Sequence, residues 1–385
     1  MRGFLSRLKL WPYRRHDKDS GTRMKLSTAI GVMSGTSMDA IDVAILRTDG
    51  VDVVETGPGR AYLYDPALRT RLLAVLSDPA RAEHDQMTDL DEAVSDAHAG
   101  AVIDFLRDFE IPAGEIDVVG IHGQTIFHKP EARFTRQFGI GSRMAATLGI
   151  DVVTRFRHAD VAAGGEGAPL APLYHKALAA TLEQPLMVLN LGGVANVTYL
   201  DGATVVAFDT GPASALLDDF LLRRRGEPFD RDGALAASGF PDMELLAKLL
   251  SHPYFTRPAP KSLDRNAFHG WAAAIERIND DATGAATLAA FTVASAVSAA
   301  SLVPGVARRW LVTGGGRHNA FFMETLRQAL GVPVDPVEDV GWDGDLLEAQ
   351  CFAYLAVRSL AGLPLSLPST TGVPYPLPGG EHWPA

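Results

Sequence analysis

The feature that most limits how this chain can fold is a pattern that occurs twice. Residues 30–46 run as an apolar strand, a turn containing glycine and a second strand, and then reach Asp49-Gly50. Residues 188–200 follow the same order and then reach Asp201-Gly202. Hairpins of this kind are common, so the pattern alone does not exclude coincidence. Read as a duplication, it predicts two related units that face a cleft, with a boundary near residues 183–185.

Short apolar runs alternate with helical segments along the rest of the chain. Apolar residues near helical spacing predict a helix over 89–109, and the short run at 116–121 is typical of a buried parallel strand. Such alternation favours an α/β fold in which helices cover a central sheet. We predict a basic flexible arm (1–26), an N-terminal domain (27–185) and a C-terminal domain with a proline-rich tail (186–385).

Composition and charge exclude several classes of protein. The chain has 35 Lys and Arg against 46 Asp and Glu, and the net charge of −11 gives no general attraction to nucleic acid or anionic membranes. Residues 1–25 hold eight basic and two acidic side chains, so the remainder carries 27 basic and 44 acidic groups, or −17. The single cysteine, Cys351, excludes an internal disulfide and fits a reducing compartment such as the cytoplasm.

Three segments need separate interpretation. The basic arm lacks the apolar run of a signal peptide, and we interpret it as a flexible extension or as sequence upstream of a start at Met24; a targeting or membrane-touching arm is the alternative. Residues 286–303 carry no charge but are mostly small, which favours a buried core helix over a membrane span. Six prolines in 364–385 predict a tail that lies over the surface.

The turn of the first hairpin has the residue types that bind phosphate. Its backbone N–H and hydroxyl groups can surround an anion, and Asp39 can hold Mg²⁺. An ordinary turn uses the same residues, so the motif alone is weak. The predicted nucleotide-binding residues here are Gly35, Thr36, Ser37, Met38, Asp39, Ala40, Ile41 and Asp42.

Two later glycine motifs extend this interpretation. Each follows a predicted strand, and they are Asp209-Thr210-Gly211 and Gly314-Gly315-Gly316. Each is weak alone, but the three motifs in this order favour a nucleotide held between two domains, with Asp39 and Asp209 as predicted metal ligands. The glycine patterns of P-loop and dinucleotide-binding proteins are absent from the sequence.

Polar residues near the middle of the first half are the candidate catalytic and substrate-binding groups. Asp160 precedes a glycine-rich loop and can serve as a general base, although a capping aspartate would look the same. His122, Gln124 and Thr125 follow the strand at 116–121, at the end where α/β folds place ligands. A metal pair of His122 and His128 lacks a third ligand.

With these motifs in this order, the chain resembles the anhydro-N-acetylmuramic acid kinases, within the superfamily of sugar kinases, hsp70 and actin. The resemblance runs from about residue 30 to residue 380. The matching segments are 35–42, 122–126, 160–172, 191–196, 208–212, 230–239, 260–262, 313–319, 348–349 and 367–372.

The resemblance implies two actin-like (ribonuclease-H-like) domains that flank a central cleft holding ATP and sugar. It implies that 35–42 is the phosphate-binding turn, that Asp160 is the catalytic base, and that Glu348 touches substrate or a water. The implied reaction uses ATP, Mg²⁺ and water to open the ring of 1,6-anhydro-N-acetylmuramic acid and phosphorylate O6. The implied setting is cell-wall recycling by a cytoplasmic homodimer.

Some residues depart from the family pattern, which often has an aspartate at the place of Arg155, a glycine at Ala40 and Gly-Asn at Ala213-Ser214. Ile140 and Ser366 also differ. Because the Ala213-Ser214 change lies beside a predicted nucleotide motif, substrate choice or turnover can differ. The alternatives are a kinase of another anhydro sugar, such as levoglucosan, and a non-catalytic ATP- or sugar-responsive regulator.

Overall fold

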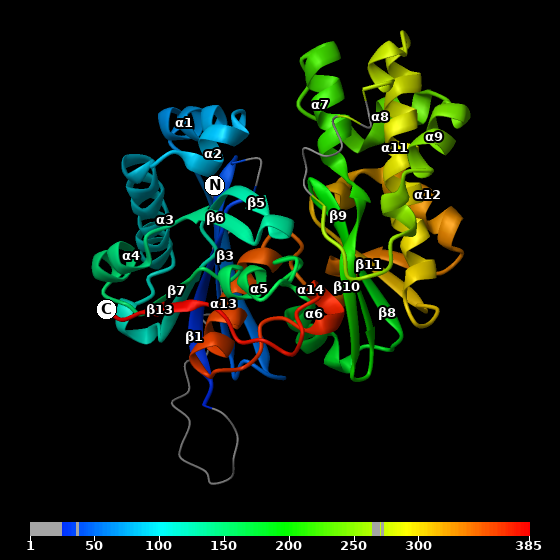
Figure 1. Cartoon of the computed structure of the whole chain (residues 1–385). Coiled ribbons are helices and arrows are strands. Elements are labelled where there is room, and N and C mark those ends of the chain that lie inside the picture. The colour runs from blue at the N-terminus through cyan, green and yellow to red at the C-terminus, as the bar shows by residue number, and fades with distance from the viewer. Residues whose placement is uncertain (1–24, 36–37, 264–269, 271–272) are drawn as a thin grey trace, which may run out of the picture.

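The chain forms two sheet-centred halves, seen side by side in Figure 1. The computed structural model describes residues 25–35, 38–263, 270 and 273–385. The predicted basic arm therefore lies outside the described residues up to residue 24, as do the predicted site residues Thr36 and Ser37.

The first half is built on a sheet of six strands in the order β13-β7-β4-β1-β2-β3. β2 runs antiparallel to both β1 and β3, and β4 and β7 continue the sheet in parallel with β1. The strands are β1 (Ser27–Met33), β2 (Ala40–Thr48), β3 (Val54–Leu63), β4 (Val118–Ile121), β7 (Val152–Thr154) and β13 (Glu381–Trp383).

A small hairpin and six helices complete this half. The hairpin consists of β5 (Gln124–Lys129) and β6 (Phe134–Phe138). Asp65 begins the first helix by accepting the backbone N–H groups of Ala67 and Leu68. The helices are α1 (Pro66–Leu76), α2 (Pro79–His84), α3 (Thr88–Asp108), α4 (Gly141–Leu148), α5 (His158–Ala162) and α6 (Pro172–Leu178).

The second half repeats the topology of the first. Its sheet has the order β10-β9-β8-β11-β12, with three antiparallel strands followed by two that are parallel to β8. The strands are β8 (Leu186–Leu191), β9 (Val194–Asp201), β10 (Thr204–Pro212), β11 (Arg309–Thr313) and β12 (Val334–Pro336). The predicted fold class, two related actin-like α/β units, is confirmed.

Helices cover the outer face of the second sheet (Figure 1). They include α7 (Ser214–Arg225), α8 (Ala234–Ser238), α9 (Met243–Leu250), α11 (Asp281–Ser298) and α12 (Ala320–Leu330). By length and hydropathy, the segment Asp281–Leu302 is the one described helix that could cross a membrane. However, α11 packs in the core of this half, as predicted, with Ala285, Ala289 and Phe291 fully buried.

The C-terminal part of the chain returns to the first half. Helix α13 (Leu347–Leu360) lies on β1, β2 and β4, and β13 pairs with β7. The helix can approach because Gly31 and Gly120 sit side by side on the sheet, where a Cβ would overlap the carbonyl oxygen of Ala349 or Phe352.

The prediction that 186–385 forms one C-terminal domain is therefore wrong for its last segment. The predicted surface tail is also partly wrong. Helix α14 (Pro368–Thr371) buries Thr370 and Thr371, and β13 adds an edge strand to the first sheet. Prolines exclude central strands, but they leave edge strands and helix starts available, and Pro368 is at a helix start.

The apolar core forms three layers set by the two-residue period of the strands. On β1, Ile30 and Val32 point to an outer core with α1, α3 and α4, while Ala29 points to the opposite side. On β8, Met187 and Leu189 point to the other outer core, and Val188 points inward. The middle layer, with α6 and α13, joins the two sheets.

Candidate active site

The predicted base, Asp160, is held by hydrogen bonds to both of its oxygens. It lies on the short helix α5 and is 2% exposed. Its Oδ1 accepts the Gly167 N–H at 2.6 Å, and its Oδ2 accepts the Thr371 hydroxyl at 2.6 Å. The carboxylate is therefore fixed in orientation, and each oxygen retains a further lone pair for a water or sugar hydroxyl.

Arg157 stands at the centre of the predicted site residues. Its Nε donates to His122 Nε2 at 2.8 Å, and one terminal nitrogen donates to the Gly167 carbonyl at 2.6 Å. Burial lowers its pKa, while the carboxylates of Glu348, Asp209 and Asp160 act in the opposite direction. The guanidinium thus lies among three carboxylates that come from both halves of the chain.

His122 supports Arg157 and is not free for proton transfer. Because arginine only donates, His122 Nε2 must accept, and Nδ1 is then the protonated nitrogen that donates to the Gly123 carbonyl at 2.8 Å. Burial, followed by the charge of Arg157, holds the pKa of His122 well below its usual range. His122 is therefore a neutral positioning group in this structure.

Two other predicted substrate residues lie nearby on β5. Gln124 is fully buried, donates to the Gly35 carbonyl at 3.3 Å and accepts the Tyr64 hydroxyl at 3.3 Å. The Gln124 side chain is therefore bonded to the first turn and does not face open space. Thr125 is half-buried on the same strand.

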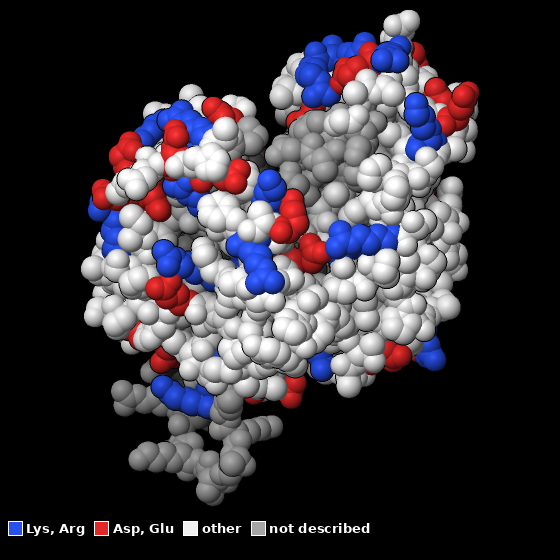
Figure 2. Space-filling model, in the orientation of Figure 1, with Lys and Arg blue, Asp and Glu red and all other residues white. Residues whose placement is uncertain are grey.

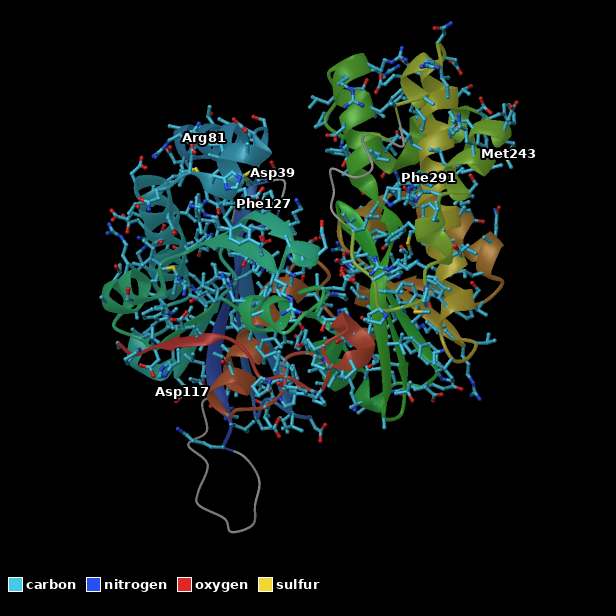
Figure 3. The ribbon with its side chains drawn as sticks, viewed as in Figure 1. Asp39, Arg81, Asp117, Phe127, Met243 and Phe291 are labelled. Carbon is cyan, nitrogen blue, oxygen red and sulfur yellow. The ribbon has the colours of Figure 1, made fainter. Side chains whose placement is uncertain are left out.

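The first turn combines core anchors with one exposed carboxylate. Met38 closes it by donating its N–H to the Gly35 carbonyl at 3.1 Å, and the Met38 side chain is fully buried. Ile41 is also buried, so both are anchors of the turn. Asp39 is exposed on the side toward the second half (Figure 3) and forms an ion pair with Arg69 at 2.9 Å.

The carboxyl group of Asp42 is affected by the charge of Glu348. Burial raises the pKa of Asp42 to about 6, and the charges of Glu348 and Asp345 add to the rise. Glu348 is in the first turn of α13 and accepts Asn190 Nδ2 at 3.2 Å. Glu348 is exposed to solvent but has many protein atoms around it. The loss of hydration that they cause raises its pKa.

The predicted turn at 209–211 is wrong in its secondary structure, because these residues continue strand β10. A bulge between Asp209 and Gly211 leaves Thr210 unpaired, buried and bonded to the Ala195 carbonyl at 3.4 Å. A Cβ on Gly211 would meet the Ser295 side chain. In this structure Thr210 and Gly211 therefore face the protein interior.

The side chains of Asp209 and Lys261 are both buried beside this strand. Asp209 Oδ2 accepts the Leu263 N–H at 2.9 Å, and burial raises its pKa to about 7. Lys261 is 1% exposed, donates to the Tyr254 carbonyl at 2.8 Å and lies 4.4 Å from the centre of that ring. Burial lowers its pKa to about 8. Lys261 belongs to the segment 260–262 that matches the family, and its side chain is not solvated.

Of the three glycines at 314–316, one has open space where a side chain would stand. A Cβ on Gly314 would meet Asn190, and one on Gly316 would meet Leu191, so both are needed for close packing against β8. Gly315 has no neighbour in that direction. Buried Arg317 fixes the segment by bonding Glu338 at 2.9 Å and Asp345 at 2.8 Å.

The described residues contain no group of three His, Cys, Asp or Glu side chains arranged to hold a metal. The predicted ligands Asp39 and Asp209 are each engaged, by Arg69 and by the Leu263 N–H. The charge of Glu348 raises the pKa of Asp42, and a divalent cation beside Asp42 would relieve that repulsion.

Sequence reasoning assigned no role to Arg157 or Thr371. Arg157 stands three residues before Asp160, a signal that was visible in the sequence. Thr371 is 211 residues from Asp160, and no local pattern reveals such a contact. The surface is hollowed between the two halves (Figure 2), and Asp39, Asp42, Asp160, Asp209 and Glu348 come from segments on both sides.

Comparison with known proteins gives a consistent result. Residues 27–384 match the family described as anhydro-N-acetylmuramic acid kinase. A protein of that name from Rhodospirillum rubrum is 53% identical over 361 residues, covering 93% of this chain and 94% of the relative. One from Acidiphilium cryptum is also 53% identical, over 357 residues, covering 92% and 97%. One from Paramagnetospirillum magneticum is 50% identical over 355 residues, covering 92% and 99%.

Proposed function

The chain belongs to the anhydro-N-acetylmuramic acid kinase family, and from this membership we propose that it opens and phosphorylates 1,6-anhydro-N-acetylmuramic acid with ATP. The products are N-acetylmuramic acid 6-phosphate and ADP. The observation that supports this most directly is the buried Asp160, whose oxygens are oriented by Gly167 and Thr371.

An anhydro bridge leaves no free 6-hydroxyl, so ring opening must accompany phosphoryl transfer. In the proposed mechanism Asp160 takes a proton from a water that attacks C1. The C1–O6 bond breaks, O6 forms its bond to the γ-phosphorus, and the bond from that phosphorus to ADP breaks. One carboxylate base acting through water predicts inversion at C1, as in inverting glycosidases.

Arg157 is proposed as the positioning residue of this arrangement. It ties His122 and the Gly167 carbonyl together and so holds the loop that contacts Asp160. The charges of Glu348, Asp209 and Asp160 act on its guanidinium, and its unbonded N–H groups are proposed to bind an anionic substrate. Glu348 is proposed to contact the sugar or a water.

Asp42, with Glu348, is the proposed holder of Mg²⁺. When bound, the ion would neutralise charge on the transferred phosphoryl group. Asp39, predicted from the sequence, would have to leave Arg69 to take part. The assembly is proposed to be a cytoplasmic homodimer, as the sequence resemblance implied.

The proposal is tested by incubating the purified chain with the anhydro sugar, ATP and Mg²⁺ and identifying the product by mass spectrometry. A 6-phosphosugar with ¹⁸O from labelled water at C1 is expected. A parallel reaction with levoglucosan decides between the two sugar classes. If neither sugar is phosphorylated, the proposed function is wrong, and a regulatory role becomes the remaining interpretation.

The base assignment is tested by Asp160→Asn. Loss of a general base is expected to lower kcat by roughly 10²–10⁴-fold. The matched control is Asp104→Asn, because Asp104 is a partly exposed aspartate of α3 outside the site. Full activity of Asp160→Asn would exclude Asp160 as the base.

A further inference from the structure

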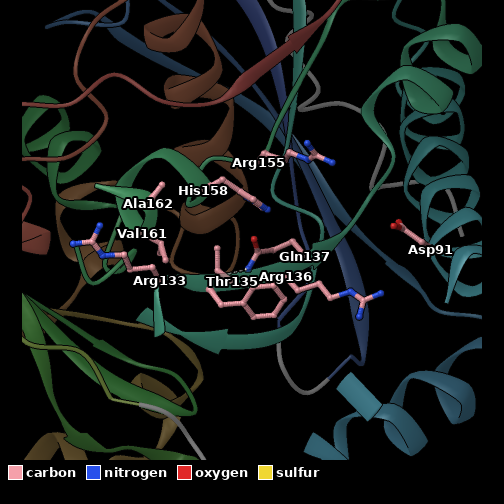
Figure 4. A pocket seen from close by; sticks show the side chains of 10 residues that line it. Asp91, Arg133, Thr135, Arg136, Gln137, Arg155, His158, Val161 and Ala162 are labelled. Atoms are coloured by element: carbon pink, nitrogen blue, oxygen red, sulfur yellow. Dashed lines mark hydrogen bonds between the residues drawn. The ribbon is translucent and has the colours of Figure 1, made fainter. Parts of the chain in front are cut away.

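A second cavity, of about 500 Å³, lies in the first half between α5 and β6 (Figure 4). From α5 it is lined by His158, Val161 and Ala162, which are spaced to share one face of the helix. Asp160 is not among its lining residues and points to Gly167 and Thr371 instead. The cavity is therefore separated from the catalytic carboxylate by the thickness of one short helix.

The cavity is locally basic in an acidic protein. Arg133, Arg136 and Arg155 line it, against one carboxylate, Asp91. The Arg133 guanidinium has no partner among the described residues. Arg136 donates one N–H to the Ala82 carbonyl at 3.1 Å.

The two other charged groups at the cavity, Arg155 and Asp91, already have partners. Arg155 pairs with Glu381 at 2.8 Å, and Asp91 accepts the Gly139 N–H at 2.7 Å. Several guanidinium donors thus remain for a ligand, in a protein with a net charge of −11.

Two buried polar atoms at the cavity also lack a partner. They are His158 Nδ1 and Gln137 Oε1, and both side chains point toward the space between α5 and β6 in Figure 4. Buried polar atoms without a hydrogen bond are uncommon in folded proteins.

We propose that this cavity binds a small, sugar-sized molecule that carries a phosphate or carboxylate, at a site distinct from the catalytic one. The volume suits a ligand of that size. The planar guanidinium groups suit an oxyanion, and Gln137, His158 and the partly exposed ring of Phe134 suit the polar and apolar parts of a sugar.

The test is isothermal titration of the full chain with glucose 6-phosphate, glucuronate and neutral glucose as probes. At least one anionic sugar is expected to bind at one site per chain, and glucose is not. Arg133→Gln and Arg155→Gln should each raise the dissociation constant of the binding probe roughly tenfold, as loss of a charge-assisted hydrogen bond predicts. Binding of neither anion would overturn the proposal.

Two controls separate this site from surface charge and from the catalytic cleft. Arg107→Gln, an exposed α3 arginine paired with Asp104, should bind the probe as the parent chain does. Equal weakening in this control would mean non-specific attraction. Saturating anhydro sugar with a non-hydrolysable ATP analogue should leave probe binding unchanged, whereas displacement would place the anion in the catalytic cleft.

The titration measures binding and no turnover, so its result does not depend on the proposed kinase activity. Thermal melting of each variant shows that it is folded. Arg133 is exposed and makes no side-chain contact that the described fold requires, so Arg133→Gln keeps the test valid even where Arg155→Gln is unstable.

Discussion

Asp160 is held by two donors with very different origins. Gly167 is in the loop that follows it, while Thr371 comes from 211 residues away. The local donor belongs to a glycine-rich stretch that the sequence already associated with catalysis. The distant donor could not be found by pattern, because its contact exists only after the C-terminal segment has returned to the first half.

Replacing Thr371 with valine should remove one hydrogen bond to Asp160 at nearly constant side-chain shape. A hydrogen bond to a charged group contributes about 1.5–3 kcal/mol, so we expect kcat to fall roughly tenfold or more. Steady-state kinetics measure this. Thr370→Val is the control, because the Thr370 hydroxyl bonds Leu367 within α14 and should affect stability more than kcat. An unchanged kcat in Thr371→Val would contradict the assigned role.

Asp209 gives the folded protein a defined pH dependence. Its folded pKa of about 7 is above the ordinary value of 3.8, so between these values the folded state retains a proton that the unfolded chain releases. Its contribution to the free energy of unfolding therefore falls as pH rises from about 4 to about 7.

In the Asp209→Asn variant this side chain cannot ionise, so the free energy of unfolding should lack this dependence on pH. Relative to the parent chain, we expect the variant to gain a few kcal/mol of unfolding free energy between about pH 5 and pH 8, measured by urea titration. His98, whose pKa burial lowers to about 4, gives an opposite slope that is common to both proteins and cancels in the difference. Parallel stability curves for the two proteins would show that Asp209 is ionised throughout.

At the level of elements, apolar runs between turn residues correctly located β1, β2, β8, β9 and the start of β10. They missed the end of β10, because Asp209-Thr210-Gly211 has turn-forming residues that a bulge nevertheless keeps in the strand. The prediction of a surface tail at 364–385 failed for a related reason. The number of prolines shows which structures a segment cannot form, but it does not show which sheet edge the segment can join.

The fit of α13 on the first sheet depends on a pair of adjacent glycines. Gly31→Ala or Gly120→Ala would drive a Cβ into the helix backbone at Ala349 or Phe352. We expect each change to lower the free energy of unfolding by about 1–3 kcal/mol or more, since backbone cannot yield as a side chain can. Urea unfolding measures the loss.

The matched control is Gly100→Ala, at a position in α3 where a Cβ meets no atom within 4 Å. There, helix propensity alone predicts a gain of up to about 1 kcal/mol. If Gly31→Ala and Gly100→Ala have the same effect, the close approach of α13 does not limit stability.

At the scale of the whole molecule, Glu166 links the two halves beside the catalytic loop. It accepts Arg257 at 2.7 Å and the Ser262 hydroxyl at 2.6 Å, both from the second half. Its backbone N–H also bonds the Thr371 carbonyl, so one residue joins the Asp160 loop, the C-terminal segment and the opposite wall.

Glu166→Ala should loosen the two halves. We expect faster amide hydrogen exchange in residues 163–167 and 257–263 and a KM for the sugar raised severalfold, because about 1 kcal/mol of pre-organisation is lost. Arg223→Gln breaks a surface pair with Glu276 inside the second half and should leave both quantities unchanged. Unaltered exchange in Glu166→Ala would mean that other contacts hold the halves together.

The position of β13 and Thr371 near the end of the sequence has a consequence for biosynthesis. The first half leaves the ribosome first, but its edge strand and one of the two donors to Asp160 are translated only after the second half. A chain that has not reached residue 371 therefore lacks one of the two hydrogen-bond donors that orient Asp160. The edge of the first sheet and the orientation of Asp160 are thus completed only after the second half has been made.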